Sequence, residues 1–362
     1  MNIFYDHTIF QQPYGGISRY FREVITRFLN KEEVDVHLFM GLFLNRYGLE
    51  NAKNRYKSYW GYPAPYVGRT GPLRQCLNRA GWFFFQTKIA YDGGKGSVYH
   101  PTYYSFSGMS RAKTVFTVYD FTHERYPHLF RTNDKTPALK RKAFERADVL
   151  ICISESTKND LSSLFTSLKC DIKTIHLGYN DLSPLVKSNI PLPDYPYFLF
   201  VGPRHEYKNF GCLLEAFALS PSLKKDFGIV CFGGTIFSEK EKKRFSELGV
   251  ADRVVRFEGG DNALAALYKN ALALVFPSLY EGQGIVVLEA RYLKLPIIVS
   301  NYSVVESVCV PNGQLVIGMT EDDIYNGMIK FTEGGVPQDY EFDCDAYNAA
   351  CHGSFEALFD KE

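Results

Sequence analysis

Short apolar segments alternate with longer helical patterns along the first half of the chain. Residues 16–30 carry apolar side chains at Phe21, Val24, Ile25 and Phe28, which is the spacing of one helix face, and residues 136–146 form a second predicted helix. The predicted strands are residues 2–5, 34–40, 97–99, 114–118 and 149–153. This βαβ alternation predicts an α/β fold, in which helices cover both faces of a parallel sheet.

The second half repeats the alternation after a segment rich in proline. Residues 189–196 hold three prolines and are predicted to be a linker. The strands predicted after it are residues 197–202, 227–232, 254–257, 271–276 and 297–300, and the helices are residues 213–218, 239–248, 263–270 and 284–293. We therefore expect two Rossmann-like, doubly wound domains, residues 1–185 and 186–340, and a helix within residues 341–362 that returns to the first domain.

Length and composition agree with two folded domains. The 362 residues are 46% hydrophobic and 22% charged, which exceeds one ordinary core and excludes a disordered or collagen-like chain. The formal net charge of +1 argues against a dedicated nucleic-acid binder, because that class neutralises many phosphates with Lys and Arg. The eight cysteines form no C-x-x-C pair, and several lie in apolar runs, so we interpret them as reduced core thiols.

Nothing in the sequence predicts a secretory signal or a membrane span. Residues 1–10 resemble a strand and carry no basic region, and no apolar stretch approaches the ~20 residues of a span, so we expect a cytoplasmic protein. Residues 56–85 mix aromatic side chains with Arg69 and Arg74. We favour an aromatic-rich core there. The alternative is a basic, aromatic face that docks on a lipid-linked acceptor or peripherally on the inner face of a membrane.

The clearest chemical signal is Phe276-Pro-Ser-Leu-Tyr-Glu-Gly-Gln-Gly-Ile-Val-Val-Leu-Glu-Ala290. An apolar strand ends, a turn with Gly282, Gln283 and Gly284 follows, and an apolar helix begins. Backbone N–H groups and the positive end of the helix therefore converge where an anion can bind. Glu281 lies on the turn and Glu289 inside the helix, so both can face one cleft.

The alternative is that Glu281 caps the helix and Glu289 is solvated. However, Glu289 lies between Leu288 and Ala290 in an apolar helix that we expect to be buried on most sides. A buried carboxylate needs a partner, and a ligand is the partner that we expect.

A second candidate cluster follows the first strand of the second domain, in Val201-Gly-Pro-Arg-His-Glu-Tyr-Lys-Asn209. Arg204 and Lys208 are expected at the carboxyl edge of the sheet, where open α/β folds bind ligands. Two fixed cations there suit a diphosphate. The alternative is a solvated loop with two surface cations.

Two loops of the first domain carry further candidates. Gly15 and Gly16 follow the first strand and precede a helix, so bare backbone can approach a phosphate or a sugar. The run Val118-Tyr-Asp-Phe-Thr-His123 follows another strand. We rank a functional role for Asp120 above one for His123, because a lone His is more often structural.

These motifs resemble, in family order and across nearly the whole chain, the retaining glycosyltransferases of family 4. The segment around Glu281 is similar to their E-x7-E motif, and Leu264-Ala-Ala-Leu-Tyr-Lys-Asn-Ala-Leu-Ala273 is similar to the lead-in to it. The resemblance implies a GT-B fold, in which the two domains face an interdomain cleft. It also implies Glu281 and the following amides at the donor sugar, Glu289 at the ribose, and Lys208, Arg204, Gly15 and Gly16 at the diphosphate.

One motif departs from the family pattern. Relatives often read Val-His-Asp where this chain has Tyr119 before Asp120. The departure puts the usual histidine role in doubt. Tyr119, Asp120 and His123 remain candidates for orienting the sugar or activating the acceptor.

The resemblance implies transfer of a sugar, with mannose our first choice, from a nucleoside diphosphate sugar to a glycan or lipid-linked acceptor in surface-polysaccharide biosynthesis. We expect a GDP-sugar rather than a UDP-sugar, and no metal or other cofactor, because no D-x-D metal motif stands out. Two alternatives remain: a nucleotide-sugar epimerase of similar fold, and a non-catalytic nucleotide-sugar-binding protein. A dehydrogenase is disfavoured, because no G-x-G-x-x-G follows a strand.

Overall fold

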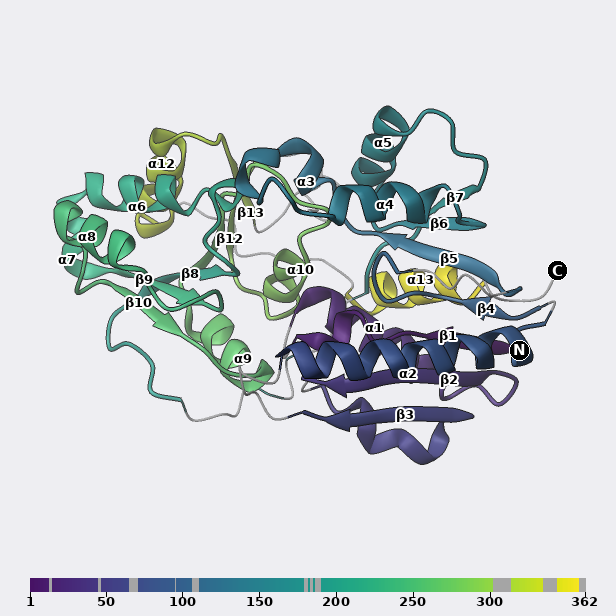
Figure 1. Ribbon diagram of the computed structural model, residues 1–362. Helices are drawn as coiled ribbons and strands as arrows, with labels where there is room; N and C mark the ends of the chain where they lie inside the picture. Colours follow the sequence, from purple (N-terminus) through teal and green to yellow (C-terminus); the bar gives the residue numbers. More distant parts are fainter. Residues whose placement is uncertain are drawn as a thin grey trace. The chain divides into compact units, whose positions relative to one another are not determined.

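The computed structural model divides into two compact units, Met1–Gly178 with Cys351–Glu362, and Tyr179–Ala350. We call them unit 1 and unit 2 (Figure 1). The residues that the structure describes are 1–12, 15–44, 47–64, 71–94, 96–105, 111–178, 182, 185, 190–301, 314–334 and 344–357.

Unit 1 is built on a parallel sheet with the strand order β3-β2-β1-β4-β5-β6-β7 in the described part of the chain. The strands are β1 (Asn2–Tyr5), β2 (Asp35–Phe43), β3 (Ser58–Pro63), β4 (Val98–Tyr99), β5 (Lys113–Val118), β6 (Val149–Cys152) and β7 (Asp171–Thr174). All five predicted strands are confirmed. The two that the sequence missed, β3 and β7, lie at the edges of the sheet, where a strand need not be apolar on both faces.

Helices cover the sheet of unit 1: α1 (Gly16–Phe28), α2 (Gly71–Asp92), α3 (Thr122–Arg125), α4 (Thr136–Phe144) and α5 (Glu155–Leu164). Short 3-10 helices occur at Ile9–Gln11, Leu49–Arg55 and Pro127–Leu129. The buried face of α1 includes Phe21, Val24, Ile25 and Phe28, as the sequence predicts. Helix α2 packs along β2 (Figure 1).

The last described helix, α13 (Cys344–Ala357), ends in unit 1. The ring of its Phe355 lies 6.2 Å from that of Tyr20, 5.9 Å from that of Phe28 and 5.7 Å from that of His100, centroid to centroid. The end of the chain therefore contributes to the core of the first unit.

Unit 2 has a parallel sheet of order β10-β9-β8-β11-β12-β13 among the described residues. The strands are β8 (Tyr197–Val201), β9 (Gly228–Phe232), β10 (Val254–Phe257), β11 (Ala273–Phe276), β12 (Ile297–Ser300) and β13 (Gln314–Ile317). The five predicted strands are confirmed, and β13, at the sheet edge, was not predicted. The helices are α6 (Phe210–Leu219), α7 (Pro221–Asp226), α8 (Glu239–Leu248), α9 (Asp261–Asn270), α10 (Ile285–Tyr292) and α12 (Glu321–Thr332), and a 3-10 helix spans Glu206–Lys208.

Successive strand residues of unit 2 enter two separate cores. Phe198 and Phe200 of β8 pack with residues of α6, α8 and α12, whereas Tyr197 and Leu199 pack with residues of α9 and α10. Figure 1 shows α6 and α12 side by side on one face of this sheet. Both faces are thus covered, and the doubly wound arrangement is confirmed.

The strand order places a ligand-binding edge in each unit. The first strand of each sheet, β1 or β8, has its next strand in sequence on one side and a later strand, β4 or β11, on the other. At such a switch point the loops at the carboxyl ends of the two central strands diverge and leave a crevice, where open α/β sheets bind ligands.

Candidate functional site

Lys208 and Glu281 meet at the switch point of unit 2. Lys208 follows β8 and Glu281 follows β11, which is the neighbouring strand. The Lys208 Nζ donates to Glu281 Oε1, and both side chains are largely buried. The two loops are joined by a backbone hydrogen bond of 2.7 Å from the Leu279 N–H to the Tyr207 carbonyl. A cation and a carboxylate from distant segments therefore share one edge of the sheet.

The start of helix α10 lies directly after Glu281. Gly284 precedes the helix with φ +81° and ψ 54°, a left-handed conformation that favours glycine. Gly282 and Gln283 are buried in the turn. The Val287 N–H donates to the Gly284 carbonyl at 2.9 Å, and the start of α10 directs the positive end of the helix dipole toward this loop.

Glu289 lies one turn into α10, and its side chain is only 2% exposed. It accepts a hydrogen bond of 2.9 Å from the hydroxyl of Tyr268, a buried residue of α9. The sequence led us to expect a ligand as its partner. Tyr268 thus supplies one partner from the protein itself, and a ligand contact of Glu289 stays a prediction.

The groups that bind Arg204 differ from those that bind Lys208. Its Nε lies 2.6 Å from Glu241 Oε1 of α8, and its Nη2 donates to the Thr235 carbonyl at 2.8 Å. Burial opposes ionisation of Glu241, but its hydrogen bonds with Arg204 and Ser238 lower the pKa of that carboxyl. The two cations thus have different carboxylate partners, and the role of Arg204 at the diphosphate stays a prediction.

The Gly-Gly loop of unit 1 lies where the sequence predicts, between β1 and α1. Gly15 is extended at φ 162°, and its N–H donates to the Tyr47 hydroxyl at 3.2 Å. A Cβ at Gly15 would lie 2.4 Å from Nε2 of Gln12. Gly16 is the first residue of α1. A side chain at Gly15 would therefore require the end of the Gln12 side chain to move.

Tyr119 is buried rather than directed to a site. Its ring lies 6.4 Å from those of Tyr20 and Tyr103 and 6.5 Å from that of Tyr104, centroid to centroid. Burial raises the pKa of the Tyr119 hydroxyl well above its usual value. The expectation of a side chain that faces a cleft is corrected: the ring packs in the aromatic core of unit 1.

Asp120 and His123 make structural contacts around α3. Asp120 Oδ1 accepts from the Thr122 N–H at 2.9 Å. His123 stacks on Phe130 at 3.8 Å between ring centroids, and its Nε2 lies 3.6 Å from Asp134 Oδ2. Both side chains shape the loop after β5, and a catalytic role for either stays a prediction.

Comparison with known proteins identifies the chemistry of this fold. Residues 185–341, which include Lys208, Glu281 and Glu289, match the family described as Glycosyl transferases group 1. The chain is a glycosyltransferase.

Two curated relatives of this glycosyltransferase have similar names. O-antigen chain mannosyltransferase B of Escherichia coli is 25% identical over 323 residues, which are 83% of this chain and 82% of that protein. O-antigen chain mannosyltransferase RfbU of Salmonella typhimurium is 27% identical over 62% of this chain and 61% of that protein. The second alignment therefore spans less than two thirds of the relative.

Solved structures establish the fold of the glycosyltransferase as GT-B, as the sequence predicts. WaaG, a glycosyltransferase involved in lipopolysaccharide biosynthesis, aligns over all of this chain and 96% of its own, with a TM-score of 0.62 and 16% identity. Anabaena Alr3699/HepE in complex with UDP and glucose aligns over 99% of this chain and all of its own, with a TM-score of 0.69 and 14% identity.

Sequence reasoning missed Asp6 of the glycosyltransferase. Its fully buried carboxylate follows β1 and accepts from the Thr102 N–H at 2.9 Å, from the Tyr99 hydroxyl at 3.4 Å and from the hydroxyls of Thr102 and Ser105. It joins the loops after β1 and β4 at the switch point of unit 1. The available signal was an Asp directly after a buried strand. The described residues contain no group of three or more His, Cys, Asp or Glu that is arranged to hold a metal.

Proposed function

We propose that this glycosyltransferase moves mannose from GDP-mannose to a glycan in surface-polysaccharide biosynthesis. Support comes from the relatives, which are named as O-antigen chain mannosyltransferases in Escherichia coli and Salmonella typhimurium. A serotype-specific mannosyltransferase of Escherichia coli, WbdA, is also similar, at 28% identity over half of this chain and 24% of its own. The choice of GDP over UDP follows from the proposed sugar.

The observation that carries the proposal is the pair of Lys208 and Glu281 beside the start of α10. A diphosphate at this edge would accept from Lys208 Nζ and from the first N–H groups of the helix, where the positive dipole end favours an anion. Without donor, Glu281 neutralises the ammonium. With donor, Glu281 would accept from a hydroxyl of the sugar, while Lys208 remains between it and the phosphates.

Glu289 is suited to hold the ribose. Its carboxylate is buried in α10 and is oriented by the hydrogen bond from the Tyr268 hydroxyl. A carboxylate accepts hydrogen bonds from hydroxyl groups and donates none when ionised. We therefore assign the ribose hydroxyls to Glu289 and the diphosphate to Lys208.

The transfer that we propose retains the anomeric configuration. The acceptor hydroxyl oxygen would bond to the anomeric carbon on the face that the leaving group vacates, as the bond from that carbon to the diphosphate oxygen breaks. The proton of the acceptor would pass to the departing phosphate. Lys208 would stabilise the negative charge that develops there. This route requires no carboxylate nucleophile.

The acceptor in this proposal is a glycan or a lipid-linked glycan, and we propose that the enzyme meets it through peripheral contact with a membrane. In the part of the chain that the structure describes, no helix is long and apolar enough to cross a bilayer.

A donor panel tests the proposal. The protein is incubated with labelled GDP-mannose, GDP-fucose, UDP-glucose and UDP-galactose, with and without lipid-linked oligosaccharide extracted from bacteria. We expect release of GDP from GDP-mannose that depends on the acceptor, and an α-linked product by NMR. An isomerised sugar would instead identify an epimerase, and donor binding without release would identify a binding protein. A β-linked product would reject retention.

A further inference from the structure

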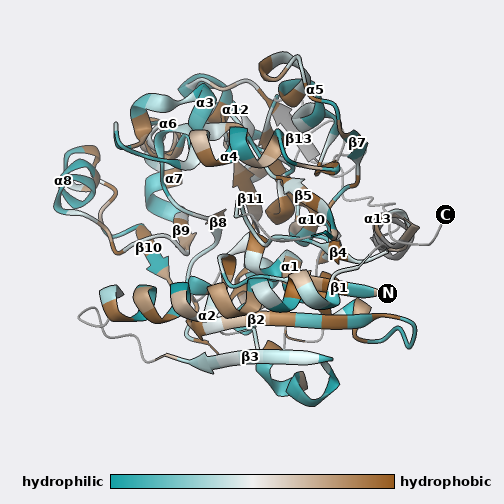
Figure 2. Ribbon diagram, turned by 45° about the vertical axis from the view of Figure 1, so that its right-hand side comes forward, coloured by the Kyte–Doolittle hydropathy of each residue, from teal (hydrophilic) through white to brown (hydrophobic). Residues whose placement is uncertain are grey.

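The outer face of helix α2 is apolar along its length. Leu73, Leu77, Phe83, Phe84 and Tyr91 have exposures between 46% and 92%. They recur at the spacing of one side of a helix, and the opposite side is buried against the sheet of unit 1. Figure 2 shows hydrophobic residues in many turns of this helix. An exposed apolar face on a surface helix is typical of a site that binds a partner.

The edge strand β3 extends this apolar face. Trp60 is 40% exposed and Tyr62 is 63% exposed. The Trp60 ring stacks on Phe39 of β2 at 4.9 Å and meets Tyr62 edge to face at 6.3 Å. We call the exposed side chains of α2 and β3 the α2–β3 face: Leu73, Leu77, Phe83, Phe84 and Tyr91 with Trp60 and Tyr62.

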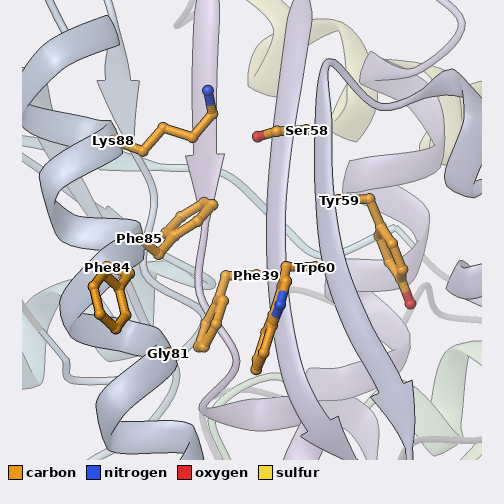
Figure 3. A pocket seen from close by; sticks show the side chains of 8 residues that line it. All are labelled: Phe39, Ser58, Tyr59, Trp60, Gly81, Phe84, Phe85 and Lys88. Carbon is orange, nitrogen blue, oxygen red and sulfur yellow. The ribbon is translucent and has the colours of Figure 1, made fainter.

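A pocket of about 360 Å³ lies within this face, between α2 and the strands (Figure 3). The stacked rings of Phe39 and Trp60 form one wall, and Phe84 and Phe85 line the side of α2. Lys88 lies at the end of the pocket away from the stacked rings, near Ser58 (Figure 3). The volume of the pocket is near the lower limit of small-molecule sites. Its apolar walls suit an unbranched hydrocarbon better than a sugar.

The charge of α2 selects among partners for this face. The helix carries Arg74, Arg79 and Lys88, and its one acidic residue is Asp92 at its end, which lies 2.6 Å from Lys88 Nζ. An anionic surface complements this charge. A second copy of the chain would instead bring two sets of cations together, which is unfavourable.

We infer that the α2–β3 face binds a bilayer that contains anionic lipids, and that the pocket between α2 and β3 takes part of an acyl chain. The inference deepens the peripheral membrane contact proposed above and rests on it. The apolar side chains would enter the boundary of the acyl chains while Arg74 and Arg79 meet the headgroups. Each of the two interpretations of residues 56–85 therefore applies to part of this segment. Phe85 and Tyr56 belong to the core, and Trp60 and Phe84 belong to the α2–β3 face.

Intrinsic fluorescence gives a direct test, because the chain has two tryptophans, of which Trp60 lies in the α2–β3 face and Trp82 packs against the core beneath α2. In a Trp82→Phe variant, emission comes from Trp60 alone. We expect vesicles of phosphatidylglycerol with brominated acyl chains to quench Trp60, and phosphatidylcholine vesicles to bind at least about tenfold more weakly. Binding without quenching, or equal binding to both lipids, would overturn the inference.

Paired variants connect the binding to the face. Phe83→Ser with Phe84→Ser removes two exposed rings and should weaken binding to phosphatidylglycerol vesicles by at least about 30-fold. Ile236→Ser, at a side chain of unit 2 that is 76% exposed, is the matched apolar control and should bind as the parent does. Arg79→Glu should weaken binding at least about fivefold, and Lys225→Glu, on an exposed position of α7, should change it less than twofold.

Two further measurements separate this inference from the proposed function. Titration with GDP should give the parent affinity in the Phe83→Ser, Phe84→Ser variant, so loss of vesicle binding with intact GDP binding concerns the face alone. Failure of the parent to bind GDP would instead reject the proposed donor. Sedimentation without vesicles should show no concentration-dependent dimer. A dimer that the double variant abolishes would assign the face to a second copy and reject the inference.

Discussion

At the scale of single residues, the burial of Glu289 is the property that bears most directly on nucleotide binding. Its carboxylate is almost fully buried, and the Tyr268 hydroxyl satisfies one of its acceptor positions at 2.9 Å. An ionised carboxylate in such a place is stable only when it is hydrogen-bonded. In the proposed function a ribose hydroxyl would donate a further hydrogen bond to this carboxylate, since an ionised carboxylate can accept several.

Glu289→Gln should weaken GDP binding about tenfold while the fold survives. The amide keeps the shape and can still accept from Tyr268, but it loses the charge that strengthens a bond from the ribose. Titration calorimetry measures the affinity, and thermal unfolding of the same sample checks the fold. Parent-like affinity would assign Glu289 to structure.

The burial of His100 leads us to predict how the free energy of unfolding depends on pH. Burial lowers the pKa of this fully buried imidazole to about 3, and its Nε2 lies 2.9 Å from Thr117 Oγ1. An unfolded His has a pKa near 6.5, so between about pH 6.5 and 3 the unfolded chain binds a proton that the folded chain does not. The free energy of unfolding should therefore fall as the pH falls, by about 2 kcal/mol at pH 5.

Urea unfolding of the parent and of His100→Gln at pH 7 and pH 5 checks this. The variant should lose less stability between the two pH values. It should retain part of the loss, because burial also lowers the pKa of His37, to about 4. The same pH dependence in both proteins would contradict the assignment.

At the scale of single residues, the sequence predicts which side chains follow strands but not where they point. Lys208 and Glu281 were both expected at the carboxyl edge of the second sheet, and they meet there. Tyr119 follows a strand in the same way, yet its ring enters the core. The orientation of the Tyr119 side chain depends on packing against Tyr20 and Tyr104. Both lie far from Tyr119 in sequence, so the sequence around Tyr119 does not indicate this orientation.

At the scale of elements, Gly284 before α10 has a left-handed backbone conformation. Gly284→Ala would place a side chain at φ +81° and a Cβ 3.4 Å from the Phe276 ring. The left-handed conformation costs about 1–2 kcal/mol for a residue with a Cβ, so we expect this loss in stability and weaker GDP binding. The matched control is Gly211→Ala in α6, where a Cβ meets no atom within 4 Å.

Gly211→Ala should stabilise the protein by up to about 1 kcal/mol, because alanine favours a helix. Thermal unfolding of both variants provides the comparison. Equal stability of Gly284→Ala and the parent would mean that the turn relaxes and does not hold α10 in place.

Central strands were predictable because they are apolar on both faces, whereas the edge strands β3, β7 and β13 were not predicted. Strand β7 is Asp-Ile-Lys-Thr with exposed positions, so it has no apolar run. Helix α2 was missed for the opposite reason. Apolar residues on its outer face as well as its buried face remove the contrast on which a helical pattern depends.

At the scale of the whole molecule, the two units use the same strand order in their sheets. Each has polar groups at its switch point, with Asp6 in unit 1 and Lys208 with Glu281 in unit 2. The sequence indicates this repetition through its two series of βα segments. The final helix could be predicted as a helix, but its aromatic contacts with α1 depend on the folded sheet.

The central claim is that a nucleoside diphosphate binds to unit 2 at Lys208. Titration of GDP into the parent, Lys208→Ala and the exposed-lysine control Lys225→Ala tests it most directly. Lys208→Ala removes a charge-assisted hydrogen bond, so its affinity should fall about 10- to 100-fold, with little change in the unfolding temperature. Lys225→Ala should bind as the parent does. The same GDP affinity in the parent and in a folded Lys208→Ala would contradict the claim.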